Sequence, residues 1–457
     1  MPEMIRKAFA VHFSELDRWS VSSFAALDWC WPEDVISPLR KALKRKSIGI
    51  DPRQDGNTDI KLITIQFTGD IIPREREASA LKGNLFRADA GDVVFSKIDV
   101  RNGAIGVIPQ ELGIVAVTSE FPVYSVDTSF ADPEYIKLLF RTQAFRGKIN
   151  GMISGASGRK RVQPDDLERM EVPLPSIDVQ RAIVHEWQQA QLEAERLRSE
   201  VADLERSIEI EILSSLGLTI QEKRQLPKSM LVEWSDLERW SVMFNQLHSV
   251  GMDLDECKVP VLTLGDVATI SYGVQKSPQN RPGSNARPYL RVANVQRGKL
   301  DLREMKYIEV SEREMDSLRL EIGDILVCEG NSPDLVGRPA IWEGEIEDCV
   351  HQNHILKARI DRQKANPYYV LEYMNTTPAR QHFRSCAKFT TNLASINSND
   401  LRNLPLPLPD ILEQERVVGV VKRIRDQTRV VLDEISVTMK EATEWIENAI
   451  VGCTIVS

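Results

Sequence analysis

The stretch Ser14-Glu-Leu-Asp-Arg-Trp-Ser-Val21 decides how this chain is built, because it returns as Ser235-Asp-Leu-Glu-Arg-Trp-Ser-Val242. Six of the eight positions are identical, and the other two exchange Asp with Glu. Three further matches follow in the same order, and the offset drifts from 221 in the first match to 232 and then 234 in the later ones. They pair Gly91–Phe95 with Gly323–Val327, Ala131–Ile136 with Ala365–Val370, and Asp166–Pro175 with Asp400–Pro409. One match could be chance, but four in register predict an internal duplication with loops of different length.

The matched pieces predict the same local structure in both copies. Asp132-Pro133 and Asn366-Pro367 each have the form of a helix N-cap followed by proline at the first helical position. Each Gly-Asp pair precedes a short apolar run that is typical of a buried strand after a turn. Each copy is therefore predicted to be a mixed α and β module. The predicted helices are Tyr135–Phe145 and Tyr368–Asn375, and the predicted strands are Val93–Phe95, Ile325–Cys328, Leu62–Phe67 and Tyr289–Val295.

A long helix with a coiled-coil repeat is predicted after each module. Apolar residues recur there at strict 4-3 spacing, which makes one narrow seam. Prolines precede both helices, and Gly217 and Gly452 are plausible C-terminal stops. The alternative is that each helix only packs on its own module, although such helices usually show a wider apolar stripe. The main seam residues are Ile183, Trp187, Leu197, Val201, Leu204, Ile208, Val417, Val421, Ile424, Val431, Ile435 and Trp445.

These patterns predict an α+β chain with four parts. Residues 1–175 form the first module and residues 176–218 the first long helix. Residues 219–409 form the second module and residues 410–457 the second long helix.

The net charge of −9 is unevenly distributed along the 457 residues. The two helical stretches 176–216 and 410–450 carry net −5 and −3, so the modules are nearly neutral and can carry local basic faces. No apolar run is long enough for a membrane span, and the N-terminus does not resemble a signal peptide. The six scattered cysteines contain no C-x-x-C pair, which argues against a zinc ribbon and suits a reducing compartment. A cytoplasmic protein is expected.

Catalytic motifs are weak. Asn366-Pro-Tyr-Tyr369 resembles the Asn-Pro-Pro-Tyr motif of adenine methyltransferases, but the second proline is missing and the sister segment is Asp132-Pro-Glu-Tyr135. A helix cap explains both copies. The sequence contains no Gly-x-Gly, P-loop or Gly-x-Ser-x-Gly motif. His351 and His354 fall in the predicted strand Val350–Leu356, where residues three apart face opposite sides, so a metal site is not expected. The sequence therefore predicts a binder, with no metal or cofactor of its own.

Basic residues gather in segments of both modules, where they could contact nucleic acid. Arginine and asparagine suit base edges, whereas lysine suits phosphates. The alternative is ordinary solvated surface charge. The candidate DNA-binding residues are Lys44, Arg45, Lys97, Arg101, Arg159, Lys160, Arg161, Arg287, Arg291, Asn294, Arg297, Arg338, Lys388 and Asn392.

The chain resembles the specificity subunits of type I restriction-modification systems over nearly its whole length. The resemblance is carried by the Pro-Leu-Pro…Gln transitions at Pro173–Arg181 and Pro407–Glu415, the paired Gly-Asp strands, and Tyr289-Leu-Arg-Val-Ala-Asn294. It implies two target recognition domains, each reading one half of a bipartite double-stranded DNA site. It also implies that the two helices pack as an antiparallel spacer with pseudo-twofold symmetry.

The resemblance further implies partner subunits. Two methyltransferase subunits, which bind S-adenosylmethionine and usually modify adenine, would dock beside the helices, and restriction subunits can join. It places Ser154–Arg161 and Lys388–Ser395 as matching loops, and Arg291–Asn294 on a strand near DNA. The first module has Ile63-Thr-Ile-Gln-Phe67 at that strand, without the arginine.

Two alternatives stay open on the sequence. The chain could be a coiled-coil adaptor that binds only proteins. It could also be the specificity subunit of a related phage-defence methylation system without cleavage. The sequence fixes neither the target bases nor the methylated base.

Overall fold

The computed structural model describes most of the chain and divides it into two compact units. Unit 1 comprises Met1–Arg198 and Asp433–Ser457, and unit 2 comprises Ser199–Leu432. The boundaries fall within both long helices, so each unit takes one half of each helix. The motif Ser14–Val21 lies outside the described residues, as does nearly all of its repeat. The described residues are 29–51, 60–77, 84–151, 161–218, 254–332, 334–389 and 393–454, with single positions 229, 231, 232, 234, 242, 245 and 456.

The module of unit 1 is mainly β-structure. Its strands are β1 (Ile36–Pro38), β2 (Leu43–Lys46), β3 (Gly49–Ile50), β4 (Lys61–Ile65), β5 (Ile71–Glu77), β6 (Leu85–Asp89), β7 (Val93–Phe95), β8 (Ile105–Val107), β9 (Ile114–Thr118), β10 (Val123–Val126) and β11 (Glu171–Pro173). They form a four-stranded sheet in the order β2-β10-β7-β8, a five-stranded sheet in the order β3-β6-β9-β4-β5, and a β1-β11 pair. The strand predicted at Leu62–Phe67 is β4, which ends before Phe67.

Strand β7 is buried on both faces, which explains its unbroken apolar run. Val93 and Phe95 pack with Tyr135 and other helix residues, whereas Val94 packs with residues of the five-stranded sheet such as Val115. The core of the module therefore has two layers, one on each side of the four-stranded sheet. The short helices of unit 1 are η2 (Leu39–Lys41), η4 (Val100–Asn102), η5 (Gln110–Leu112), α2 (Pro133–Leu139), α3 (Gln143–Gly151) and α4 (Pro164–Arg169).

The module of unit 2 repeats this plan. Its strands are β12 (Val261–Thr263), β13 (Ala268–Tyr272), β14 (Ala286–Leu290), β15 (Val295–Gln296), β16 (Lys299–Leu300), β17 (Lys306–Glu309), β18 (Ile325–Cys328), β19 (Gly330–Asn331), β20 (Pro339–Ile341), β21 (Val350–His351), β22 (Ile355–Ile360), β23 (Lys388–Phe389), β24 (Ala394–Ser395) and β25 (Pro405–Pro407). The sheet β13-β22-β18-β20 corresponds to β2-β10-β7-β8 of unit 1. Smaller sheets have the orders β17-β14-β21, β19-β24-β23, β12-β25 and β15-β16.

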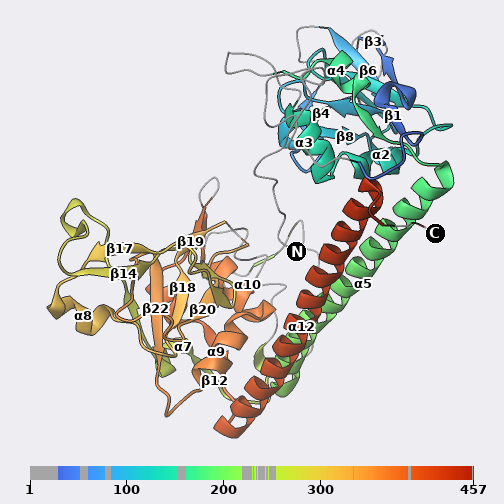
Figure 1. Cartoon of the computed structure of the whole chain (residues 1–457). Helices are drawn as coiled ribbons and strands as arrows, with labels where there is room; N and C mark the ends of the chain where they lie inside the picture. Colours follow the sequence, from blue (N-terminus) through green and yellow to red (C-terminus); the bar gives the residue numbers. More distant parts are fainter. Residues whose placement is uncertain are drawn as a thin grey trace. The chain divides into compact units, whose positions relative to one another are not determined.

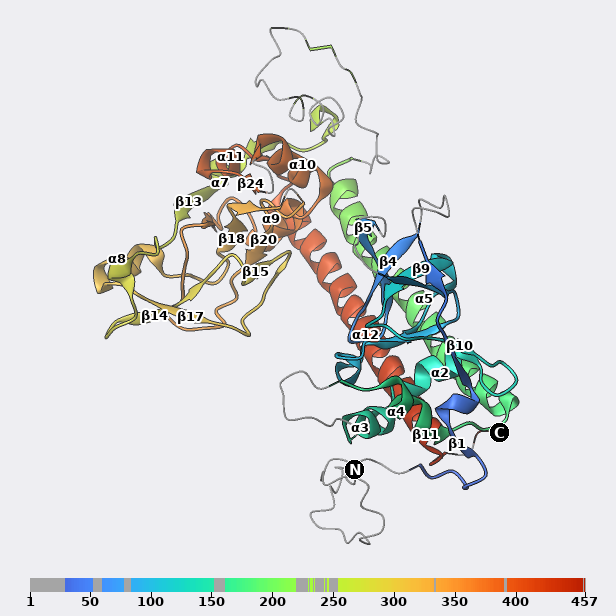
Figure 2. The ribbon, with the colours of Figure 1, turned by 90° about the horizontal axis from the view of Figure 1, so that it is seen from above.

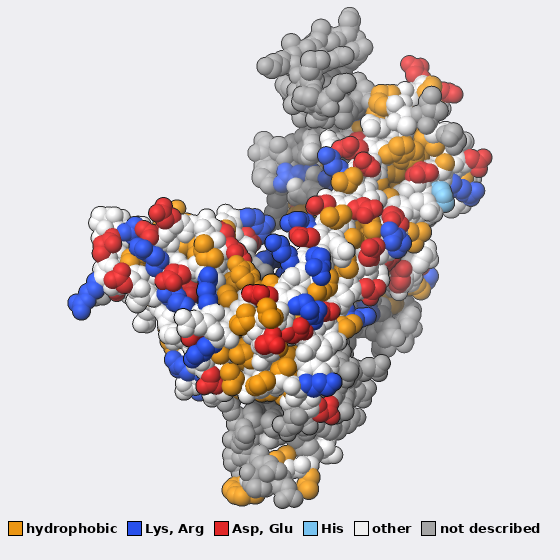
Figure 3. All heavy atoms as spheres, turned by 90° about the horizontal axis from the view of Figure 1, so that it is seen from below, with side chains coloured by type: hydrophobic (Ala, Val, Ile, Leu, Met, Phe, Trp, Pro, Cys, Tyr) orange, Lys and Arg blue, Asp and Glu red, His pale blue; other side chains and the backbone are white. Residues whose placement is uncertain are grey.

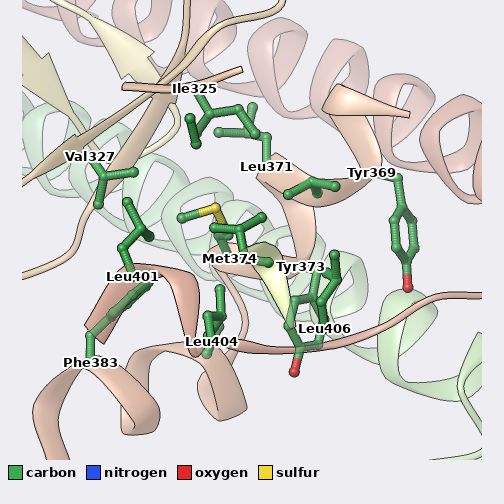
Figure 4. Close-up of a cluster of buried hydrophobic side chains, with 14 of the residues drawn as sticks. Ile325, Val327, Tyr369, Leu371, Tyr373, Met374, Phe383, Leu401, Leu404 and Leu406 are labelled. Carbon is green, nitrogen blue, oxygen red and sulfur yellow. The ribbon is translucent and has the colours of Figure 1, made fainter. Parts of the chain in front are cut away.

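Strand β18 is also buried on both faces. Ile325 and Val327 belong to the cluster that contains Tyr369, whereas Leu326 and Cys328 belong to a cluster around Trp342. Figure 4 shows the first cluster, in which side chains from β18, the helices and the segment around β25 turn toward one another. The short helices of unit 2 are η7 (Leu254–Glu256), α7 (Leu264–Val267), η8 (Pro278–Asn280), α8 (Glu312–Leu318), α9 (Pro367–Met374), α10 (Thr377–Cys386) and α11 (Ser398–Arg402).

Two long helices, α5 (Ile177–Ser215) and α12 (Ile411–Val451), connect the units. They lie side by side in Figures 1 and 2. Unit 1 contains the start of α5 and the end of α12, and unit 2 contains the end of α5 and the start of α12, so the two helices run antiparallel. Gly217 and Gly452 follow their ends with φ of 77° and 92°, the left-handed conformation of a helix stop. The twelve seam residues are all buried or half-buried.

The helix ends belong to the module cores as well as to the seam. Ile446 and Ile450 of α12 join the core of the first module, and Ile212 and Leu213 of α5 join the core of the second. Each module is therefore completed by the end of the helix that follows the other module.

Three sequence predictions need correction. The helix predicted at Tyr135–Phe145 is two helices, α2 and α3, because the chain turns at residues 140–142. The strand predicted at Tyr289–Val295 is interrupted by a turn at residues 292–294. The strand predicted at Val350–Leu356 is β21 and the start of β22, separated by a turn.

Candidate nucleic-acid interface

Two buried glutamines fasten the long helices to the modules. Gln180 accepts a hydrogen bond from the Asp132 amide at 2.9 Å, and its amide group donates to the Phe130 and Pro175 carbonyls at 2.9 and 2.8 Å. Gln414 repeats this with the Asn366 amide at 2.8 Å and the Pro409 carbonyl at 2.7 Å. The glutamine of each Pro-Leu-Pro…Gln transition thus has a structural role, because it satisfies backbone groups where module and helix meet.

A buried tyrosine in each module bonds to the same junction between module and long helix. The Tyr135 hydroxyl donates to the Pro173 carbonyl at 3.0 Å, and the Tyr369 hydroxyl donates to the Pro407 carbonyl at 2.9 Å. Burial raises the pKa of both tyrosines. Tyr369 belongs to the segment that resembles a methyltransferase motif, and its hydroxyl is used inside the core.

The remaining residues of that segment form a helix cap. The Asn366 side chain accepts a hydrogen bond from the Tyr368 amide at 2.9 Å, and Asp132 accepts one from the Glu134 amide at 2.8 Å. Proline occupies the first helical turn in both copies. The predicted caps are therefore confirmed.

Carboxylates from the far ends of the long helices cap a second helix in each module. Glu447 of α12 accepts hydrogen bonds from the Gln143 and Ala144 amides at the start of α3, at 2.9 and 3.3 Å. Glu209 of α5 accepts one from the Thr377 amide at the start of α10. These contacts orient the helices that lead into the two loop segments. They were not predictable from the sequence, because nothing local to a helix end indicates which distant amide it meets.

Three candidate residues of the first module are near one another. Lys97, just after β7, donates to the Ser119 carbonyl at 2.7 Å, and its backbone amide donates to the Glu120 carbonyl. Arg161 pairs with the Glu120 carboxylate at 3.2 Å, and the Val162 amide donates to the Lys97 carbonyl. Arg101 follows in η4 and is exposed. Arg159 and Lys160 lie outside the described residues. A basic end of β7 is the candidate surface here.

Lys44 and Arg45 lie apart from this group, on β2. Arg45 pairs with Asp165 at 2.5 Å and Glu168 at 2.7 Å, so carboxylates of its own module neutralise it. Lys44 is exposed and donates to the Arg40 carbonyl at 3.4 Å.

The corresponding surface of the second module is the small sheet β19-β24-β23. Lys388 and Phe389 are exposed on β23, beside the exposed Leu393. The Ile396 amide donates to the Glu329 carbonyl just after β18, as Val162 does to Lys97 after β7. The described residues that directly follow the two matching loops, Val162 and Ile396, therefore occupy the same place in both modules. Asn392 lies outside the described residues.

Arg291 and Asn294 lie in a turn and not on the expected strand. Asn294 is only 3% exposed. Its oxygen accepts from the Arg291 amide at 2.9 Å, and its nitrogen donates to the Asp301 and Glu304 carbonyls at 2.7 and 3.1 Å. These bonds occupy the side chain inside the protein, so a base contact by Asn294 does not fit this geometry.

Arg287 and Arg291 are both partly buried. Arg287 pairs with Glu312 at 2.6 Å and Asp348 at 3.3 Å. Arg291 lines a polar pocket of about 300 Å³ together with Asp301, Arg303 and Glu304. Arg297 and Arg338, by contrast, lie with other arginines near α10 and make no ion pair among the described residues.

His351 and His354 have different surroundings. Burial, and next the charge of Lys357, lower the pKa of His351 to about 4. His354 is exposed and lies 2.7 Å from a Glu329 oxygen. No group of three or more His, Cys, Asp and Glu residues in the described parts of the chain could hold a metal ion.

Among the helices described, none combines the length and apolarity needed to cross a membrane. On the face drawn in Figure 3, Lys and Arg are interspersed with Asp and Glu.

Comparisons with known proteins give a consistent picture. No protein-family model matches the chain. The putative type I restriction enzyme MjaX specificity subunit of Methanocaldococcus jannaschii is 32% identical over 135 residues, which cover 29% of this chain and 32% of that protein. The type I restriction enzyme EcoKI specificity subunit of Escherichia coli strain K12 is 22% identical over 294 residues, which cover 64% of this chain and 58% of that protein. The chain thus spans less than two thirds of the length of either relative.

The fold is shared with a solved protein. A structure that addresses complex assembly and conformational transition of the type I R-M system superposes with a TM-score of 0.56 at 17% identity, covering 91% of this chain and 97% of that one. The resemblance to type I specificity subunits is therefore confirmed, as is the fold of two mixed α/β modules with a long helix pair.

Proposed function

We propose that this chain is a non-catalytic specificity subunit that directs a DNA methyltransferase to a bipartite double-stranded target. The observation that carries the proposal is the duplicated module. Both copies keep the same sheet, glutamine contact and helix caps, while the loops at the ends of β7 and β18 differ in residues and length. A common scaffold with variable loops suits two readers of two different half-sites.

Methyltransferase subunits are the proposed partners. The acidic stretches of the long helices are better suited to protein docking than to phosphate contact. S-adenosylmethionine and the adenine-modifying chemistry would belong to those partners, and a restriction subunit could join them. A related defence system without cleavage would need the same chain.

The test is co-expression with a methyltransferase encoded beside it, followed by purification and mapping of modified bases in the host genome. We expect a stable complex and a methylated motif made of two separated halves. Failure to bind a methyltransferase, together with no retention of duplex DNA at low salt, would favour the protein-only adaptor.

A module exchange tests the division of the target. Replacing residues 1–175 with the first module of a relative should change one half of the motif and leave the other intact. Because Asp433–Ser457 belongs to the same unit, a matched chimera should take this segment from the same donor as well. Both chimeras should read the same new half, and the matched one should be more stable. A change in both halves of the motif would contradict the proposal.

A further inference from the structure

Four arginines of the second module lie close together, because the charges of Arg380 and Arg338 both act on Arg297. Arg297 lies in the β15-β16 turn and donates to the Asp334 carbonyl at 3.3 Å, and Arg384 of α10 is 3.8 Å from the Asp334 carboxylate. Arg338 precedes β20 and donates to the Val292 carbonyl at 3.0 Å. Arg380, one turn before Arg384 on α10, is 3.5 Å from Glu209. We call Arg297, Arg338, Arg380 and Arg384 the arginine cluster.

The positive charge of the cluster is poorly balanced. Arg338 is only 6% exposed, yet neither it nor Arg297 makes an ion pair within the described parts of the chain. Asp334 is 83% exposed and Glu209 also caps α10, and the sequence of α10 contains no acidic residue. The Nε atoms of Arg338 and Arg384 are buried and have no partner there.

This arrangement costs stability without a ligand. Arginines four residues apart on a helix repel each other, and a buried charge without a counterion is expensive. Burial, and then the charges of Arg380 and Arg338, lower the pKa of Arg297. An anion seated on the cluster would relieve both costs. Guanidinium groups bind phosphate oxygens through paired hydrogen bonds, so phosphate is the anion that they suit best.

The first module lacks two of the four arginines of this cluster. The registers of β7 with β8 and of β18 with β20 place Ala104 at the position of Arg338. Counting from the starts of α3 and α10, Arg146 matches Arg380 and Asn150 matches Arg384. The arginines at positions 338 and 384 are thus specific to the second module and are not a requirement of the shared fold, although the first module places its own Arg141 near Arg146.

We propose that the arginine cluster binds phosphodiester groups of the DNA backbone and anchors the second module independently of base sequence. This inference rests on the proposed function. Arg380 and Arg384 are the contacting residues, since their side chains are 40% and 42% exposed. Arg297 and Arg338 lie behind them and strengthen the positive potential. Lys388 and Phe389 follow α10 directly, which places the anchor beside the loop segment expected to read bases.

The test measures binding of the full-length chain to a mixed-sequence duplex of about 40 base pairs over a range of salt concentrations. Each lost phosphate contact should lower the slope of log K against log salt by about 0.9. Arg380→Ala with Arg384→Ala should therefore lower it by about 2, and affinity at low salt should fall at least tenfold. Arg303→Ala, which removes an arginine that is 89% exposed, is the matched control and should change neither value.

Arg338→Ala separates a binding role from a structural one. The variant copies Ala104 of the sister module. We expect weaker duplex binding together with an unchanged or higher melting temperature, because an uncompensated buried charge is removed. A lower melting temperature with unchanged duplex binding would assign Arg338 a structural role and contradict the inference.

The outcomes also separate the inference from the proposed function. Duplex binding by the wild type with an unaltered salt slope in the Arg380/Arg384 variant would overturn the phosphate anchor alone. No duplex binding by the wild type at low salt would overturn DNA recognition and the anchor together. A melting temperature raised by inorganic phosphate only when the arginines are present, with an unaltered DNA salt slope, would identify a free anion as the ligand and reject the duplex.

Discussion

The two modules agree in their interior and differ at their surface. Both have a strand buried on two faces, a tyrosine hydroxyl on a proline carbonyl, and a glutamine that joins the module to its helix. They differ at the ends of β7 and β18, where the first module has Lys97 bonded to the Ser119 carbonyl and Arg161 paired with Glu120, and the second has the arginine cluster. The comparison teaches that duplication preserved what satisfies the backbone and left the exposed positions free to acquire different ligands.

The glutamine contacts should show the largest effect in this comparison. Gln180→Ala and Gln414→Ala each leave an amide and one or more carbonyls unsatisfied in a buried place, at about 1 to 3 kcal/mol for each group. We expect each variant to lose about 3 to 4 kcal/mol of unfolding free energy, measured by urea denaturation. The exposed glutamines Gln189 and Gln427 lie on the same two helices, and their replacement by Ala should change stability by less than about 0.5 kcal/mol. A loss at Gln180 or Gln414 no larger than that at Gln189 or Gln427 would contradict the role of these glutamines at the junctions.

A buried histidine should make the second module more sensitive to acid than the first. The turns before β10 and β22 match, because the Phe121 amide donates to the Thr118 carbonyl and the Ile355 amide donates to the Gln352 carbonyl. This register places Val117 of the first module at the position of His351, so the first module has no titratable group there. The pKa of His351 is lowered to about 4 by burial and by Lys357, whereas an unfolded histidine titrates near 6.5. Its contribution to stability is thus complete above about pH 6.5 and is lost as the pH falls toward 4, amounting to about 3 kcal/mol.

Hydrogen exchange followed against pH checks this difference between modules. Amides of β21 and β22 should lose protection between about pH 6 and pH 4, before those of β9 and β10. His351→Asn keeps a side-chain donor but does not titrate. It should therefore reduce the difference between the two modules in the pH at which amide protection is lost. Replacement of the exposed His185 by Asn is the control and should leave it unchanged. Simultaneous loss of protection in both modules of the wild type would refute the prediction.

Features that depend on neighbours along the chain were predictable from the sequence. The strands Val93–Phe95 and Ile325–Cys328 have the predicted bounds, and Asp132 and Asn366 cap helices as predicted. The turn at Asn294 also had a local signal, because asparagine often bonds to nearby backbone in turns. The alternating apolar residues around it favoured a strand instead.

Features that depend on distant contacts were not predictable. The contact of Glu447 with Gln143 joins residues 304 positions apart, and no period or motif selects that pair. The placement of Arg338 in the arginine cluster depends on how β20, α10 and the β15-β16 turn pack. Arg297 and Arg338 were recognisable as basic residues from the sequence, but their lack of a carboxylate partner among the described residues follows from packing alone.

A pair of cysteines distinguishes the two helix ends. The Cys30 and Cys453 sulfurs are 2.8 Å apart and both residues are exposed, while the Cys30 amide donates to the Val451 carbonyl. The Lys258 amide makes the equivalent bond to Leu216 in unit 2, where the sister of Cys453 is Leu218. Oxidised glutathione should accept two electrons and two protons from the two thiols, which forms the protein disulfide and two molecules of reduced glutathione. We expect a gain of about 2 kcal/mol in unfolding free energy. A thiol titration should show the loss of two thiols, and Cys30→Ser should abolish both effects; a wild type that keeps all six thiols would refute the prediction.

The helix caps should give the smallest change and the sharpest contrast with catalysis. Asp132→Ala and Asn366→Ala each remove one side-chain bond to the first turn of a helix, which costs about 1 kcal/mol. Because both side chains cap a helix in the same way, the two losses in unfolding free energy should agree within experimental error. Asp132→Asn should leave the unfolding free energy nearly unchanged. DNA methylation by the complex with a methyltransferase, measured below the melting temperature, should be unchanged in both alanine variants. A loss of methylation confined to Asn366→Ala, with its stability intact, would break the equivalence of the modules and restore a catalytic role for that segment.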